Sequence, residues 1–251
     1  MKTLTMMFAA SLLICAAGYG RAASEPDAAK PDKIEAAKLA EQRGDLARVR
    51  SNYDLAAAYY QAALRVDRRN SVLYNKLGIA ELQLHQKSLA RRNFQLALKI
   101  DPQSVSAVNN LGAVALWDKK YKSAIDFFKQ ALAMDETSAT THVNLAEAWM
   151  GLGEMDRAMT EYARALELDA DVLSDTQGGS QIQLTSPAQR ARVNYLIAKS
   201  YMKRGNIDGA LDYLGRAKDL HFPDLSKKVY SDPDFTALWN DPRLAKIVKR
   251  S

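Results

Sequence analysis

A 34-residue repeat that recurs without gaps is the feature that most restricts the fold of this 251-residue chain. The segment LYNKLGIAELQLHQKSLARRNFQLALKIDP begins at Leu73, and aligned segments begin 34 and 68 residues later. This register places the starts of three units near Ser71, Val105 and Ala139. Self-similarity at a fixed period indicates small structural units, each of which buries its apolar face only against its neighbours. We therefore expect a solenoid.

The spacing inside a unit predicts two antiparallel helices. In the unit that begins at Ser71, the small residue Gly78 precedes Ala90 by twelve positions, and Phe94 and Ala97 follow at helical spacing. Small residues at these places allow two helices to cross closely, while the bulky residue and the alanines share one face of the second helix. Two further units, from Ala37 and Ala191, have the same internal spacing, although the second of them begins eighteen residues later than the 34-residue period places it. The small residue at position 8 of the five units is Gly44, Gly78, Gly112, Ala146 or Ala198.

These units resemble tetratricopeptide repeats, a family with the same period. The family's pattern falls in the second unit on Tyr74, Leu77, Gly78, Glu81, Ala90, Phe94, Ala97 and Pro102, and only Glu81 departs from it. The resemblance implies an all-α fold, a right-handed α-solenoid of antiparallel helix pairs closed by C-terminal capping helices. The five units expected from the register are 37–70, 71–104, 105–138, 139–172 and 191–224.

Asparagines recur at corresponding places in these units. In the family, residues five, six, nine, twelve and thirteen of each unit point into a concave groove. Asn75 and Asn109 occupy the fifth place, and Asn110 and Asn144 occupy the sixth. A carboxamide both donates and accepts hydrogen bonds, so these side chains are candidates for binding an extended peptide backbone. The alternative is that they only bridge neighbouring helices.

The other groove positions suggest which peptides would fit. Arg192, Tyr195 and Lys199 give the fifth unit a basic and aromatic face, while Trp117 contributes either to the groove or to the core. Such a surface suits an extended segment with apolar side chains and an acidic or C-terminal carboxylate end. The apolar residues expected in the middle of the groove are Ile79, Leu82, Ala113, Leu116, Val143 and Met150.

Residues 173–190 interrupt the register between the fourth and fifth units. Ser186, Pro187 and Gln189 have the pattern of a helix start with a capping box, so the first helix of the fifth unit should begin before Ala191. The remainder is expected to be a surface loop, and the alternative is a loop that regulates access to the groove.

Within the C-terminal residues 225–251, the segment 230–251 is expected to form two short helices, with Ser231 and Asp241 as N-caps. Because a solenoid needs its last apolar face covered, we expect them to cap the array. The alternative is a docking element for a partner.

The N-terminus has the three regions of a secretory signal peptide. A basic residue, Lys2, precedes an uncharged apolar run of fourteen residues, Leu4 to Ala17, which is shorter than the roughly 20 residues that span a bilayer. Small residues then favour cleavage after Ala22, so 1–22 would be removed. The protein is expected to be exported, to the periplasm or the medium, and the alternative is a lipid anchor on Cys15.

Residues 23–36 would then form a linker and the start of the first helix. Removal of 1–22 lowers the net charge from +6 to +4 and leaves no cysteine, so disulfides are not expected. The weak positive charge is no signature of nucleic-acid binding. No membrane-spanning segment is expected.

The sequence contains no phosphate-binding loop, no nucleophile elbow and no histidines at metal-ligand spacing. We therefore expect neither an enzyme nor a cofactor. The favoured function is a scaffold outside the cytoplasm that binds a protein or peptide partner in the groove. The alternative is a structural subunit of an envelope complex that uses the convex face or the C-terminal tail.

Overall fold

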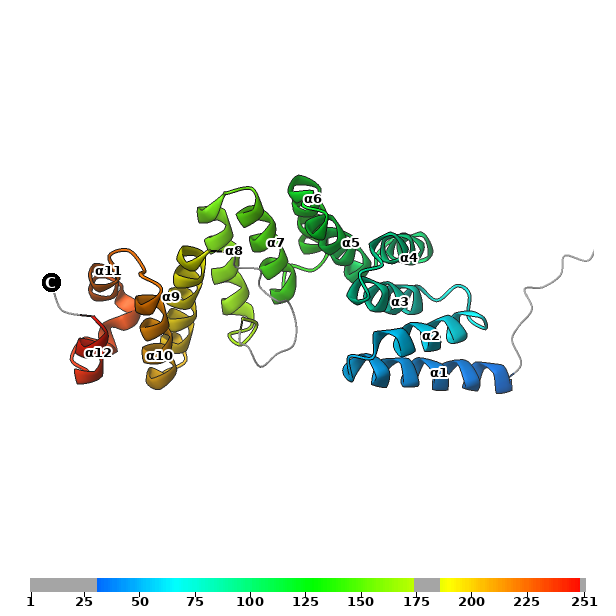
Figure 1. Cartoon of the computed structure of the whole chain (residues 1–251), viewed down its shortest axis with the longest axis horizontal. Coiled ribbons are helices and arrows are strands. Elements are labelled where there is room, and N and C mark those ends of the chain that lie inside the picture. The colour runs from blue at the N-terminus through cyan, green and yellow to red at the C-terminus, as the bar shows by residue number, and fades with distance from the viewer. Residues whose placement is uncertain (1–30, 174–185, 249–251) are drawn as a thin grey trace, which may run out of the picture.

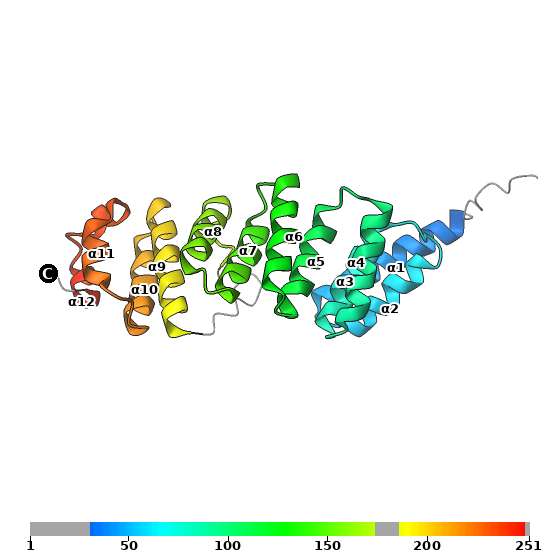
Figure 2. The ribbon, with the colours of Figure 1, turned by 90° about the horizontal axis from the view of Figure 1, so that it is seen from above.

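The computed structural model describes residues 31–173 and 186–248, and every regular element in this part of the chain is a helix. The helices follow one another as a row of packed pairs, with α1 at one end and α12 at the other (Figures 1 and 2). The elements are α1 (Pro31–Val49), α2 (Tyr53–Leu64), α3 (Ser71–Gln83), α4 (Lys87–Ile100), α5 (Val105–Trp117), α6 (Tyr121–Met134), α7 (Ala139–Gly151), α8 (Met155–Leu168), α9 (Pro187–Lys203), α10 (Ile207–Asp219), α11 (Leu225–Ser231), the 3-10 helix η1 (Pro233–Leu238) and α12 (Pro242–Ile247).

The predicted units correspond to consecutive helix pairs. The helices α3, α5 and α7 begin at Ser71, Val105 and Ala139, the starts expected from the 34-residue period. Each first helix packs against its own second helix, and each first helix after α1 also packs against the second helix of the preceding unit. The fold is the predicted all-α solenoid of antiparallel pairs.

Side-chain caps fix several helix starts. The Ser186 hydroxyl accepts a hydrogen bond from the Gln189 backbone N–H, and the Gln189 side chain accepts one from the Ser186 N–H. This reciprocal capping box confirms the expectation that α9 begins before Ala191, with Pro187 at its first position. Asn70 and Ser138 cap α3 and α7 more simply, because each side chain accepts one hydrogen bond from a backbone N–H of the first turn.

The core of each unit depends on a bulky side chain that lies on the small residue of the first helix. A Cβ atom on Gly112 would lie 2.5 Å from Cε1 of Phe128, far inside van der Waals contact. The expected alanine of the crossing, Ala124, is fully buried beside this ring. The corresponding pairs in the other units are Gly44 with Tyr60, Gly78 with Phe94, Ala146 with Tyr162, and Ala198 with Leu214.

Glu81, the one departure from the family pattern in the second unit, is buried in the structure. The Asn93 side chain donates a hydrogen bond of 2.6 Å to one of its carboxylate oxygens. Burial raises the pKa of the Glu81 carboxyl, and the hydrogen bond from Asn93 opposes this effect. Asn93 therefore supplies the hydrogen-bond partner that the buried Glu81 carboxyl group requires.

Residues 225–248, which we call the C-terminal cap, cover the last pair of the solenoid. The fully buried side chains of Phe235, Leu238 and Leu244 belong to one core with Ala210 and Leu214 of α10. This arrangement confirms the expected capping role.

The predicted N-cap of the first of these helices was wrong. The two short helices expected in 230–251 are η1 and α12, and α11 precedes them; η1 is capped by Asp232 rather than Ser231, and the Asp232 carboxylate accepts from the Asp234 N–H. Ser231 is instead the last residue of α11, where its hydroxyl donates to the Lys228 carbonyl. Asp241 caps α12 as expected.

Some predictions fall outside the described residues. These are the signal peptide 1–22 with Cys15, most of the linker 23–30, and the part of the insertion loop from 174 to 185. In the segments that the structure does describe, no helix combines the length and the apolar character needed to cross a membrane.

The close contact inside a unit gives a test of the register. Replacing Gly112 with Leu should lower the free energy of unfolding by about 1–3 kcal/mol, because the new side chain would displace the Phe128 ring. The matched control is Gly215→Leu in α10, where a Cβ would meet no heavy atom within 4 Å. Urea unfolding should show that this control is neutral or stabilising, since Leu favours helix over Gly. Equal effects at both sites would contradict the proposed packing.

Candidate functional site

Polar side chains link the first helices of neighbouring units in a regular series. The fifth residue of one unit contacts the sixth residue of the next, so that the partners are 35 residues apart. Asn110 Nδ2 donates to Asn75 Oδ1 at 2.9 Å, and Asn144 Nδ2 donates to Asn109 Oδ1 at 3.2 Å. The four candidate asparagines are therefore brought together as two pairs, and both pairs bridge units as the alternative interpretation expected.

A charged pair precedes the two amide pairs in the same series. Lys76 Nζ lies 2.7 Å from Glu41 Oε1 and also 2.7 Å from Asp45 Oδ2. This pair was not predicted from the sequence, although the spacing of 35 residues between opposite charges could have indicated it. We call the three contacts, Glu41 with Lys76, Asn75 with Asn110, and Asn109 with Asn144, the inter-unit pairs.

The amides keep capacity for further hydrogen bonds. A carboxamide carries two N–H donors and an oxygen with two lone pairs. In each amide pair one donor and one lone pair are used, and all four asparagine residues are half-buried. Each pair thus holds a fixed orientation and presents the remaining donors and acceptors at a partly accessible surface.

In the first unit, the residue at position 9, Asp45, is hydrogen-bonded to the aromatic residue of the second helix, Tyr60. The Tyr60 hydroxyl donates to Asp45 at 2.8 Å. Burial and this hydrogen bond raise the pKa of Tyr60 to about 12. Burial would raise the pKa of Asp45, but the hydrogen bonds from Lys76 and Tyr60 outweigh it and the pKa is lowered.

The fourth unit also combines an acidic residue at position 9 with a tyrosine in the second helix. Glu147 occupies position 9, and burial together with its charge raises the pKa of the Tyr162 hydroxyl. The second and third units have Phe94 and Phe128 instead, with apolar residues at position 9. An acidic residue therefore stands at position 9 where the aromatic residue carries a hydroxyl group.

Trp117 lies at the C-terminal end of α5 and is half-buried. Its ring packs against the core of Phe94, Leu111 and Val114, and its centroid lies 5.7 Å from that of His85. The side chain therefore contributes to the core while part of its surface stays accessible.

Val143 was expected to line the groove, but it is fully buried. It packs in one apolar cluster with Leu196, the residue at position 6 of the fifth unit. The series of inter-unit pairs thus ends in an apolar contact between the fourth and fifth units. Leu82, another expected groove residue, is buried in the core that contains Phe94. The assignment of both Val143 and Leu82 to the groove was therefore wrong.

The candidate residues of the fifth unit contact the C-terminal cap. The Tyr195 hydroxyl donates to Asp232 at 2.9 Å, and its ring stacks on Phe222 with centroids 5.0 Å apart. Lys199 Nζ lies 2.7 Å from Asp232 and 3.2 Å from Asp234. Tyr195 and Lys199 of the expected basic and aromatic face are therefore already paired with carboxylates of the chain itself.

These contacts shift the pKa values of both partners. Burial would raise the pKa of Asp232, but the hydrogen bonds from Lys199 and Tyr195 lower it below its usual range. Burial would lower the pKa of Lys199, and its two carboxylate partners raise it instead. Arg192 is half-buried and forms no ion pair with any described residue.

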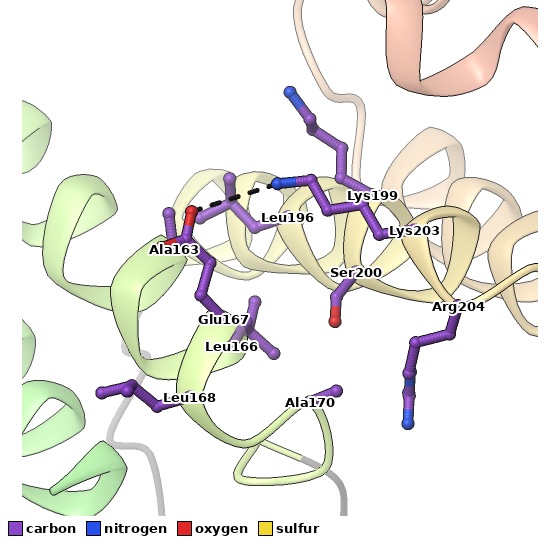
Figure 3. A pocket seen from close by; sticks show the side chains of 10 residues that line it. All are labelled: Ala163, Leu166, Glu167, Leu168, Ala170, Leu196, Lys199, Ser200, Lys203 and Arg204. Atoms are coloured by element: carbon purple, nitrogen blue, oxygen red, sulfur yellow. Dashed lines mark ion pairs between the residues drawn. The ribbon is translucent and has the colours of Figure 1, made fainter. Parts of the chain in front are cut away.

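A cleft of about 530 Å³ lies between α8 and α9 (Figure 3). Its floor is apolar, with Leu166 and Leu196 among the lining residues, and Lys203 reaches Glu167 across it at 4.0 Å. Arg204 at its rim pairs with Asp171 at 3.2 Å. The repeat pattern did not predict this cleft, because the cleft lies where the insertion breaks the 34-residue register.

The histidines have separate surroundings. His142 Nδ1 lies 2.7 Å from Glu161, whereas His221 contacts the Asp219 carbonyl. Within 31–173 and 186–248, no three histidine, cysteine or acidic side chains are grouped closely enough to hold a metal ion.

Sequence comparisons identify the family. Profiles described as tetratricopeptide repeat match residues 41–105, 75–139 and 115–177, which together span more than half of the chain. The chain belongs to the tetratricopeptide repeat family. A search of curated proteins finds no match.

Solved tetratricopeptide structures share the fold at low sequence identity. A thermophilic tetratricopeptide protein from Thermus thermophilus, TTC0263, is 18% identical, with a TM-score of 0.54 over 78% of this chain and 96% of that one. MamA from Desulfovibrio magneticus RS-1, residues 41 to the end, is 20% identical, with a TM-score of 0.52 over 76% of this chain and 97% of that one. These similarities support the solenoid fold.

The contacts of Asp232 predict a pH-dependent stability. Asp232→Asn should lower the free energy of unfolding by about 1–3 kcal/mol at neutral pH, because Lys199 loses its nearest charged partner while the amide can still cap η1. The folded pKa of Asp232 is lowered, so the stabilisation is complete above the unfolded value near 3.9 and disappears as pH falls through the folded pKa. Thermal melts from pH 7 to pH 2 should show the two proteins converging in acid.

The control for this prediction is Asp234→Asn. Asp234 lies farther from Lys199 and its side chain is more exposed than that of Asp232, so the loss should be smaller. A constant difference between Asp232→Asn and the wild type at every pH would contradict the role assigned to the charge.

Proposed function

We propose that this tetratricopeptide repeat protein is a non-enzymatic scaffold that binds an extended segment of a partner protein along α3, α5 and α7. Membership of the family supports a role in protein interaction. The observation that carries the finer proposal is the two amide pairs, which hold half-buried carboxamides in fixed orientations across three consecutive units.

An extended peptide matches this arrangement chemically. Its backbone presents N–H and C=O groups at regular intervals, and a carboxamide can bind either kind of group regardless of the peptide's side chains. Ile79, Ala113, Leu116 and Met150 lie on the same helices as the amides, are half-buried, and would accept apolar side chains. We therefore expect a segment with several apolar residues.

The fifth unit would bind the acidic end of the segment. Arg192 is the candidate for this contact, because it has no carboxylate partner among the described residues. Tyr195 and Lys199 would contact a partner only if its carboxylates replaced those of Asp232 and Asp234. Trp117 would contribute the accessible part of its ring.

The alternative role, as a structural subunit of an envelope complex, would use the convex face or the C-terminal tail. The large apolar side chains of the tail, Phe235, Leu238 and Leu244, are buried in the cap. No observation on the tail therefore favours docking over capping, and peptide binding is the function that we propose.

We further propose that the protein acts outside the cytoplasm, on the basis of the N-terminal sequence alone. Expression of the chain from its own start should yield an exported product that begins near Ala23 or Ser24. Mass spectrometry of the purified protein tests this expectation. An intact Met1 on a cytoplasmic product would contradict export, whereas an acyl group on Cys15 would support the lipid-anchored alternative.

The amide pairs give the test of peptide binding. A peptide selected from a random phage-displayed library should bind Asn109→Ala/Asn144→Ala more weakly than the wild type, by about 2- to 12-fold for each hydrogen bond lost. The thermal midpoint should change little, because the lost inter-unit bond is offset by the higher helix propensity of alanine. Fluorescence anisotropy and thermal melts on one preparation measure both quantities.

Two further variants separate ligand contact from bridging. Asn75→Glu/Asn110→Lys reproduces the charged pair of Glu41 and Lys76, so it should keep the inter-unit link and still weaken binding. Gln130→Ala removes an exposed carboxamide from the second helix α6 and should change neither quantity. If the alanine pair lowers the melting temperature without weakening binding, the amides are bridges alone.

A further inference from the structure

The first helix of the solenoid has a face that no described element covers. Leu39, Arg43 and Leu46 occupy positions 3, 7 and 10 of the first unit, and all three are exposed, Leu39 at 46% and Leu46 at 50%. A single exposed leucine is ordinary, but two on one face at a spacing of seven residues form a stripe. We call these three residues the open face.

In the later units, the residues at positions 3, 7 and 10 pack against the preceding unit. Leu73, Leu77 and Ala80 hold the same three positions in the second unit, and none is more than 4% exposed because they pack against α2. Leu111 and Val114 are likewise buried in the core that contains Phe94 of the preceding unit. The open face therefore has the geometry of an inter-unit interface that lacks its partner.

The charges around the open face are ordered along the helix. Asp32, Glu35, Leu39, Arg43 and Leu46 follow one another at intervals of three or four residues, which places them on one side of α1. Carboxylates occupy the N-terminal end of this stripe, and Arg43 lies at its C-terminal end. All five residues are exposed, and neither Glu35 nor Arg43 forms an ion pair with a described residue.

This order is self-complementary under a two-fold axis. If two α1 helices cross antiparallel at Leu39, the residue four positions after it lies opposite the residue four positions before it in the other copy. Arg43 then lies opposite Glu35 of the second copy, and symmetry forms the same ion pair twice around a contact between the two Leu39 side chains. The open face of one copy cannot stack head-to-tail on the last helix pair of another copy, because the C-terminal cap covers the apolar face of that pair.

We propose that a second copy of this chain covers the open face, forming a two-fold dimer through antiparallel α1 helices. This inference is independent of peptide binding, because it uses residues at the end of the solenoid and none of the amide pairs. The two Leu39 side chains supply the apolar contact at the two-fold axis, and the ion pairs between Arg43 and Glu35 fix its direction, while Leu46 lies toward the N-terminal end of the other α1. The dimer would join two binding surfaces at their N-terminal units.

A charge exchange tests the dimer. Sedimentation equilibrium of the full chain at concentrations up to about 100 µM should detect a dimer in the wild type. Arg43→Glu and Glu35→Arg should each raise the dissociation constant about tenfold or more, because like charges then face each other twice. The double variant restores opposite charges and should return the dissociation constant toward the wild-type value.

A folding defect would not produce weaker dimerisation in each single variant and recovery in the double variant, since both residues are exposed and the double variant carries both substitutions. Arg92→Glu on the exposed side of α4 makes the same change of net charge and should leave the dimer intact. Three outcomes would overturn the proposal: a monomeric wild type at all concentrations, a single variant that dimerises normally, or a double variant that stays monomeric. A monomer that instead binds vesicles of anionic lipid through Leu39 would assign the open face to a membrane surface.

Discussion

The contact between a bulky side chain of the second helix and the small residue of the first sets the geometry of every unit. In three units this is an aromatic ring on glycine, as for Phe128 on Gly112. Because the ring lies directly on the helix backbone, the two helices approach closely and their relative rotation is fixed. The same contact recurs every 34 residues, so the direction from one unit to the next is also repeated. The inter-unit pairs and the burial of positions 3, 7 and 10 depend on this repetition.

The inter-unit pairs change in chemical character along the solenoid. The first boundary is charged, through Lys76 with Glu41, the next two are made by amides, and the fourth is apolar, through Val143 and Leu196. Geometry requires only that two side chains of suitable size meet at these positions. Charged, amide and apolar pairs all satisfy this requirement, and amides are the type that retains hydrogen-bonding capacity for a ligand.

Much of the fold could be predicted from sequence because the repeat fixes the helices. The starts of α3, α5 and α7 and the capping box at Ser186 follow from local patterns, which need no knowledge of neighbouring units. The errors concern contacts between units and at the ends. The position of Val143 was taken from the family's groove pattern, but its burial depends on how closely the fifth unit packs. The pairing of Lys199 with Asp232 joins residues that no periodic pattern relates, and so the sequence offered no signal for it.

The C-terminal cap also determines where the protein can change in length. A sixth unit added after α10 would have to replace side chains such as Leu225 and Phe235 that already fill the last apolar face. Duplication of a 34-residue block inside the array, in contrast, would supply a new fifth and sixth position together and recreate both of its boundaries. Tandem duplication within the gene is thus the route by which such a surface could lengthen while both ends of the molecule stay as they are.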